Sequence, residues 1–315
     1  MVEYRPRGII KEYLLWVAKL ITLLAIFVVV VPLVVIAVVG AADQAAKAKQ
    51  GLHVSKDKRV AVIELQGMIV DSKEVLADLY KQSEDDRIKG IVLRVDSPGG
   101  AVGPSQEIYE AIKKLKDRKP IVVSMGSVAA SGGLYVSLAA SKIFCQPGTI
   151  TGSIGVVMQV PNFTKLANQV GVDMITLKSG KLKDAGNAFR PMTEEERQYL
   201  ETTLAEAHKD FIIAVARSRN LDPDRVVEFA DGRILLGSQA LKLKLVDEYG
   251  DVISAARSVF DILGAPLQAD ELPELYYPTD NLEKFRKLLS AISDLPLMLN
   301  RQLFNGNAEL QYLMQ

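Results

Sequence analysis

The sequence of 315 residues has few of the side chains that most often carry metal, redox or imidazole chemistry. It contains one cysteine, Cys145, which excludes an intrachain disulfide and a multi-cysteine metal site. It contains two histidines, His53 and His208, so candidates for an imidazole base are scarce. Acidic and basic side chains balance at 38 each, which argues against a strongly basic nucleic-acid-binding protein.

Cofactor motifs are also missing. The glycine-rich segments match neither the phosphate-binding P-loop nor the dinucleotide fingerprint, and we expect neither a cofactor nor a metal ion. The overall composition is near the globular average, with 49% hydrophobic and 24% charged residues. This excludes a disordered or fibrous chain, and the length leaves room for about two domains.

An uncharged apolar run occupies residues 20–39. Its length of about 20 residues matches the bilayer core, and Tyr13 and Trp16 precede it where an aromatic belt is expected. A cleaved signal peptide is the alternative, but its apolar region is usually about 7–15 residues. We expect a short cytoplasmic N-terminus at residues 1–19 and a transmembrane helix at residues 20–40. The flanking lysines and arginines do not decide the orientation.

Residues 41–58 are rich in alanine, lysine and glutamine and are predicted to form a polar tether. From residue 59 onward, strand-like apolar runs alternate with amphipathic helical patterns, which is typical of a parallel sheet with crossover helices. Strands are predicted at residues 60–70, 90–95, 120–125 and 232–236, and helices at residues 75–82, 105–115 and 238–243. A capping box at Thr193 and Glu196 predicts a long helix towards Arg217. We expect one α/β domain at residues 59–264.

The composition changes after Gly264. Prolines interrupt the chain, and apolar residues then recur with helical spacing at Leu282, Phe285, Leu288, Leu289 and Ile292. We expect residues 265–315 to form a C-terminal helical tail that packs on protein. A helix on the membrane surface is the alternative.

Two glycine-rich segments each follow a predicted strand. Residues 96–100 read DSPGG, and residues 124–133 read SMGSVAASGG. Ligands bind at the carboxyl ends of strands in open α/β sheets, and a helix beginning at Ser131 would direct free N–H groups towards an oxyanion. Small residues flank Ser131, which makes it the best candidate nucleophile. Tight turns without a catalytic role are the alternative for both segments.

A serine nucleophile needs a base. His53 lies in the expected tether, and His208 is expected on the solvated surface of the long helix, so a histidine base is poorly supported. A lysine can serve if burial lowers its pKa from about 10.4 towards 7–8. Lys178, Lys181 and Lys183 lie close together, and the residues alone do not identify which of them is buried. A solvated basic loop is the alternative.

Several motifs occur in an order that resembles the signal peptide peptidase A family. They read SPGG (97–100), GSVAASGG (126–133), TGSIGV (151–156), KLKDAG (181–186) and RPMTEEER (190–197). The resemblance covers roughly residues 59–264 and is to the short form, with one catalytic domain. It implies a membrane-bound serine peptidase with a Ser-Lys dyad and a fold like that of Clp protease and crotonase.

The resemblance also implies roles for individual residues. These are the nucleophile Ser131, the general base Lys183, the backbone oxyanion donors Gly100 and Gly132, and a hydroxyl that helps to position the lysine, Ser153. One position departs from the family pattern. Leu134 stands where the family usually has tyrosine, and Tyr135 follows it. We expect this departure to affect the side chains that line the site near the nucleophile, and not the dyad.

The function implied by the resemblance is an endopeptidase that hydrolyses cleaved signal peptides through an acyl-enzyme. Its catalytic domain would lie on the extracytoplasmic side of the plasma (inner) membrane, with no nucleic-acid partner. A homo-oligomeric ring is also implied, in which Ser131 and Lys183 come from neighbouring subunits. The tail beyond Gly264 is a candidate self-processing site.

Three other functions stay open. One is a related membrane peptidase that acts on misfolded proteins. Another is a catalytically silent membrane scaffold, against which the presence of both Ser131 and Lys183 argues. The third is acyl-CoA chemistry on a crotonase-like fold, which would give no reason for a membrane anchor or for Lys183.

Overall fold

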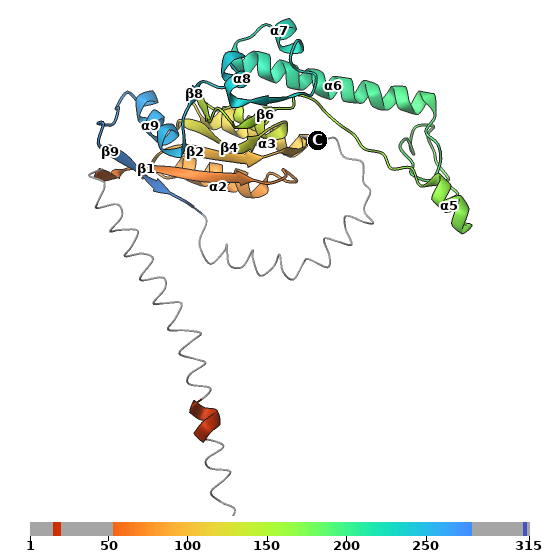
Figure 1. Ribbon diagram of the computed structural model, residues 1–315, viewed down its shortest axis with the longest axis horizontal. Helices are drawn as coiled ribbons and strands as arrows, with labels where there is room; N and C mark the ends of the chain where they lie inside the picture. Colours follow the sequence, from red (N-terminus) through yellow and green to blue (C-terminus); the bar gives the residue numbers. More distant parts are fainter. Residues whose placement is uncertain (1–14, 20–52, 279–310, 314–315) are drawn as a thin grey trace, which may run out of the picture. The chain divides into compact units, whose positions relative to one another are not determined.

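A computed structural model describes residues 15–19, 53–278 and 311–313 (Figure 1). The expected transmembrane helix at residues 20–40 and the expected helix at residues 282–292 lie outside the described residues. Within the described part of the chain, no helix combines the length and the apolar character that crossing a bilayer requires.

The centre of the fold is a mainly parallel sheet. Its strands are β1 (His53–Gln66), β2 (Ile88–Ser97), β4 (Ile121–Ala129), β5 (Lys142–Cys145), β6 (Ile150–Gly152), β7 (Ile234–Leu236), β8 (Glu248–Tyr249) and β9 (Glu271–Tyr276). The main path runs β7-β6-β4-β2-β1-β9, and β5 branches from β4 to meet β8. Strands β1, β2, β4 and β5 pair in parallel, whereas β6 and β7 are antiparallel. The predicted α/β class is confirmed.

Helices cover both faces of this sheet. The helices between residues 53 and 278 are α2 (Lys73–Glu84), α3 (Val102–Leu115), α4 (Gly132–Ser137), α5 (Thr164–Val170), α6 (Glu194–Arg219), α7 (Pro223–Val227), α8 (Gly237–Lys242) and α9 (Val252–Ile262). Successive side chains of a strand point to opposite faces. In β1, Ala61 and Ile63 therefore join the larger core with α2, α3 and α4, while Val60 and Val62 pack with α9.

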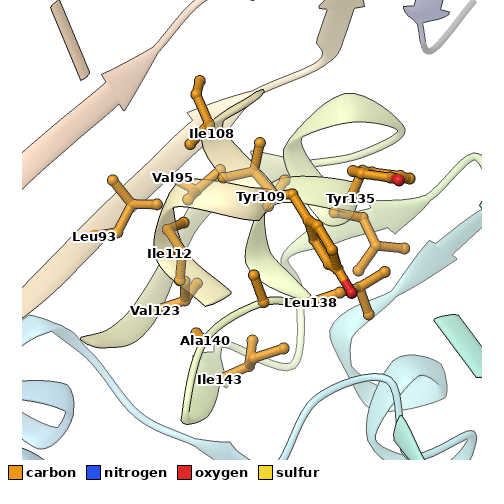
Figure 2. Close-up of a cluster of buried hydrophobic side chains, with 14 of the residues drawn as sticks. Leu93, Val95, Ile108, Tyr109, Ile112, Val123, Tyr135, Leu138, Ala140 and Ile143 are labelled. Carbon is orange, nitrogen blue, oxygen red and sulfur yellow. The ribbon is translucent and has the colours of Figure 1, made fainter. Parts of the chain in front are cut away.

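The larger core positions the glycine-rich turns. Figure 2 shows Leu93 and Val123 of the sheet beside Ile108 and Ile112 of α3, and all four side chains are fully buried. Helix α3 has the amphipathic pattern expected for residues 105–115 and begins three residues earlier. Packing of α3 and α4 on the same face brings the starts of both helices to the carboxyl ends of β2 and β4.

The folded unit is longer at both ends than we expected. Strand β1 begins at His53, so residues 53–58 of the expected tether belong to the sheet. Beyond the expected boundary at Gly264, β9 extends the sheet beside β1. Lys58 pairs with Glu271 at 2.7 Å, and the Arg59 guanidinium donates to Glu274 at 3.0 and 3.1 Å.

An arm formed by residues 157–192 has little regular structure apart from α5. It rejoins the fold at Thr193, which caps α6 through the predicted capping box with Glu196. Figure 1 shows α5 near the N-terminal end of α6. Apolar side chains on the arm are unusually exposed, with Ile175 at 84% and Leu177 at 94%. The three candidate lysines lie on this arm.

Candidate active site

Ser131 occupies a strained turn between β4 and α4. Its φ of 52° and ψ of −115° lie in a region that non-glycine residues rarely adopt, at a typical cost of about 1–3 kcal/mol. The Ser131 N–H donates to the Gly152 carbonyl oxygen at 2.9 Å, which helps to hold this backbone. The side chain is fully buried, and Oγ has no hydrogen-bond partner among the described residues. A buried hydroxyl held under strain without a partner is the strongest nucleophile candidate.

Gly132 and Gly100 approach each other closely beside Ser131. A Cβ on Gly132 would lie 3.2 Å from the Gly100 nitrogen and 2.7 Å from the Ser105 Oγ. A Cβ on Gly100 would lie 2.1 Å from the Ile69 oxygen. Only glycine fits at either position without displacing neighbouring atoms. Because Gly132 is the first residue of α4, its N–H has no acceptor within the helix. The two amides together suit a developing oxyanion.

Asp96 and Ser97 fasten the two glycine-rich segments together. The Val128 N–H donates to Asp96 Oδ1 at 3.0 Å, and the Ala130 N–H donates to the Ser97 carbonyl at 3.1 Å. The Ser97 hydroxyl also accepts from the Gly99 N–H at 3.1 Å. We did not predict this positioning role. The sequence feature that could have indicated it is the pair of polar residues at the end of an apolar strand.

Ser153 directly follows Gly152, whose carbonyl oxygen accepts the hydrogen bond from the Ser131 N–H. It has a φ of 51°, is 5% exposed, and donates its N–H to the Arg233 carbonyl at 2.8 Å. Gly152 and Arg233 hold it at the junction of β6 and β7. The structure thus places four of the five expected site residues together: Ser131, Gly100, Gly132 and Ser153.

The fifth, Lys183, lies on the exposed arm. No lysine is hydrogen-bonded to Ser131 among the described residues. Lys178 pairs with Asp184, and Lys181 pairs with Glu195. Within the part of the chain that the structure covers, Lys183 is the one lysine of the three without an ion pair. None of the three is buried, so the burial expected for a lysine base does not exist within a single chain.

The surroundings of both histidines differ from those that we expected. His53 begins β1 instead of lying in a tether. His208 on α6 is half-buried, and its Nε2 is enclosed without a hydrogen-bond partner among the described residues, so it is less solvated than we expected. Neither histidine is hydrogen-bonded to Ser131. The lack of support for a histidine base therefore holds in the structure as well.

Leu134 and Tyr135 belong to α4 and anchor this helix in the larger core. Leu134 is fully buried in the larger core, and the Tyr135 ring lies 5.0 Å from the rings of both Tyr109 and Phe211. Figure 2 shows Tyr109 and Tyr135 in this cluster. Burial raises the pKa of Tyr135 to about 12, so the phenol stays neutral. The departure from the family pattern therefore affects the packing that supports α4.

Cys145 is unsuited to act as a nucleophile in this fold. Cys145 is fully buried, and burial raises its pKa to about 11, which keeps the thiol protonated at neutral pH. No group of three or more histidine, cysteine, aspartate or glutamate side chains in the described ranges is arranged to hold a metal ion.

A strand near the C-terminal end of the chain pairs with the segment that contains Gly100. Strand β10 (Gln311–Leu313) pairs antiparallel with β3 (Gly99–Ala101), and Tyr312 lies opposite Gly100. The other side of β3 is held by Ile69, whose oxygen accepts from the Ala101 N–H at 2.7 Å. The remaining edge of β3 therefore binds an extended backbone beside Gly100, as a peptide substrate would require.

Several known proteins similar to this chain are named as proteases or peptidases. The model of Peptidase family S49 matches residues 113–262, and the Clp protease model matches residues 28–150. A putative protease of Synechocystis sp. is 36% identical over 82% of this chain and 87% of its own length. A putative protease of Methanocaldococcus jannaschii is 41% identical, and the putative signal peptide peptidase SppA of Enterococcus faecium is 37% identical. These two alignments cover 56% and 62% of this chain, and the chain spans 56% and 61% of these relatives.

These similarities agree with the structure. The Clp protease match accounts for the mainly parallel sheet with helices on both faces. The alignment with the putative protease of Synechocystis sp. spans 258 residues, so it includes the glycine-rich turns and the arm. The chain belongs to peptidase family S49 and is a serine peptidase.

Proposed function

We propose that this peptidase is a membrane-anchored endopeptidase that cleaves peptides with a dyad of Ser131 and Lys183. The observation that carries the proposal is the buried, strained and unpartnered Ser131 hydroxyl next to the amides of Gly100 and Gly132. Lys183 is favoured as the base because Lys178 and Lys181 are already paired with carboxylates.

The proposed reaction is acyl transfer. Ser131 Oγ attacks the scissile carbonyl carbon while Lys183 Nζ takes the hydroxyl proton. The carbonyl oxygen gains negative charge, which the amides of Gly100 and Gly132 stabilise. Lys183 gives the proton to the leaving amine, and an acyl ester remains on Ser131. A water molecule, deprotonated by Lys183, then attacks the ester. The bond between the acyl group and Ser131 Oγ breaks, Oγ takes the proton back from Lys183, and the second product leaves.

Two copies of the chain are needed in this proposal. Lys183 is exposed on an arm whose apolar side chains are also exposed, among them Ile175, Leu177 and Val170. Contact with a second copy would remove this apolar surface from water and would also exclude water from the lysine. The proposed homo-oligomeric ring therefore supplies the low-polarity setting that a neutral lysine base requires.

The proposed substrates are cleaved signal peptides. An extended, apolar peptide suits the edge of β3 that β10 occupies in this structure, because an extended backbone pairs there. The apolar run at residues 20–39 supports an anchor in the plasma (inner) membrane, which would hold the catalytic domain on the extracytoplasmic side near such peptides. A relative from Enterococcus faecium carries the name putative signal peptide peptidase. Misfolded membrane proteins are the second candidate substrate class, favoured by the same extended edge.

The first test is cleavage of a fluorogenic peptide of small apolar residues by the full chain in detergent. Wild type is expected to cleave it and to react with a fluorophosphonate at Ser131. Lys183→Ala should lose cleavage, while Lys181→Ala, which removes an exposed lysine on the same turn, should keep it. An active Lys183→Ala variant would refute the assigned base. Folded, oligomeric wild type that neither cleaves nor reacts would favour the scaffold alternative.

Removing the C-terminal strand should make the peptidase bind substrate more tightly. Deletion of residues 311–315 frees the β3 edge, so the KM for an extended peptide is expected to fall several-fold with little change in kcat. Deletion of residues 314–315 leaves β10 in place and serves as the control. Equal KM values for both deletions would show that β10 does not compete with substrate. Mass spectrometry of the active wild type would reveal whether the chain also processes this tail.

A further inference from the structure

Arg190 connects the turn that carries Lys183 to the start of α6. Its Nε donates to Asp184 Oδ2 at 3.0 Å, and one terminal nitrogen donates to the Asp184 carbonyl oxygen at 3.2 Å. The other terminal nitrogen donates to Glu196 Oε2 at 2.8 Å. A single guanidinium therefore holds both the residue that follows Lys183 in the chain and the first turn of α6.

Both carboxylates of this cluster are removed from water. The Asp184 side chain is 11% exposed and the Glu196 side chain 4% exposed, although most of the surrounding arm is open to solvent. Glu196 Oε2 also accepts from the Thr193 N–H at 2.9 Å as part of the capping box. The cluster is thus attached to the capped N-terminus of α6.

Lys178 completes the cluster from the other side of the turn. Its Nζ contacts Asp184 and donates to the Lys181 carbonyl at 3.0 Å. The Lys183 N–H donates to the Gly180 carbonyl oxygen at 3.1 Å. The backbone on both sides of Lys183 is therefore held, while its own side chain stays without an ion pair among the described residues.

The charges in the cluster compensate one another. Arg190 beside Glu196 lowers the pKa of that carboxyl to about 2, and Lys178 and Arg190 lower the pKa of Asp184. Both acids therefore remain ionised at any pH at which a peptidase with a lysine base would work. Asp184 and Glu196 form their ion pairs with Arg190 and Lys178, and neither carboxylate pairs with Lys183 in the described residues.

We propose that Arg190, held between Asp184 and Glu196, is a positioning residue that aims Lys183 at the serine nucleophile. The inference rests on the proposed function of Lys183 as the base. Arg190 touches neither the substrate nor the reacting atoms in this account. A lysine cannot replace it, because only the planar guanidinium reaches Asp184 and Glu196 at once with separate N–H groups.

The test measures kcat and KM of the full chain on a fluorogenic peptide. Arg190→Ala is expected to lower kcat by about 10²-fold, the usual effect of a small misplacement of a catalytic group, with KM nearly unchanged. Millimolar guanidinium should restore part of the lost kcat, whereas Arg190→Lys should not. Arg197→Ala is the matched control, because Arg197 lies on the exposed side of the same helix turn and makes only ion pairs of 3.9 Å.

A double variant separates positioning from general support of the fold. In the Lys183→Ala background, Arg190→Ala should add no further loss in the rate of fluorophosphonate labelling of Ser131, because both changes act through one lysine. Additive losses, or a rise in KM at constant kcat, would overturn the inference. If Arg190→Ala does not assemble, Glu196→Gln carries the test, since glutamine can still accept from Thr193 but loses the charge facing Arg190.

The outcome for Lys183→Ala distinguishes the two proposals. If Lys183→Ala is inactive while Arg190→Ala and Glu196→Gln match wild type, the positioning role is wrong and the dyad stands. If Lys183→Ala is fully active, the dyad itself is wrong.

Discussion

Ser131→Ala and Lys183→Ala subunits, each inactive alone, should together recover about a quarter of wild-type activity when they are mixed and reassembled. Each single variant removes one half of the dyad, and the expected loss is roughly 10⁴-fold or more. In a mixed ring, an interface is active only where an intact Ser131 meets an intact Lys183 from the neighbouring chain. Random equal mixing produces this arrangement at about one interface in four.

The structure gives this experiment its rationale. Ser131 is buried among the turns of the sheet, whereas Lys183 lies on an exposed arm with exposed apolar neighbours. The measurement is peptide cleavage after the purified variants are dissociated, mixed and reassembled, with unmixed variants treated in the same way as controls. If both groups of the dyad came from the same chain, mixing would recover nothing. Recovery close to wild type would point to exchange with intact protein.

Gly132→Ala is expected to lower kcat by about 10²–10³-fold without unfolding the chain. Its Cβ would lie 2.7 Å from the Ser105 Oγ and 3.2 Å from the Gly100 nitrogen, so the two proposed oxyanion amides must move apart. The loss should be concentrated in kcat because the amides stabilise charge that exists only in the transition state. KM for the peptide should change little.

The matched control for this substitution is Gly103→Ala. Gly103 lies in α3 near the same turns, and a Cβ there would meet nothing within 4 Å. Alanine at this helical position is expected to leave activity unchanged and to stabilise the fold slightly. Circular dichroism and the oligomeric state would show whether each variant is folded. A fully active Gly132→Ala enzyme would remove Gly132 from the oxyanion site.

Local patterns predicted the regular elements well. The amphipathic spacing in α3 and the capping box of α6 are short-range features, and both are confirmed. The fold continues past the expected boundary at Gly264, because Pro273, one of the prolines that interrupt the sequence there, does not end the folded domain. Strand β9 contains this proline and lies at the end of the strand order, and an edge strand tolerates a missing N–H donor.

Settings that depend on distant segments were harder to predict. His208 has a surface-like sequence context on α6, yet its Nε2 is buried. The hydrogen bonds of Arg190 with Asp184 and Glu196 were also not predicted, although the three residues lie close together in the sequence. Charged side chains of this kind are usually solvated, and only the path of the arm onto α6 buries the two carboxylates.

The sequence by itself determined the α/β class, the two glycine-rich turns and the choice of Ser131, because periodicity and small residues are local properties of the chain. The tertiary structure decided three further features: the strained backbone of Ser131, the approach of Gly132 to Gly100, and the exposure of Lys183. These depend on contacts between segments far apart in the sequence, whose distances no local pattern encodes. The strain at Ser131 is held by Gly152, and the close approach exists because β2 and β4 end side by side.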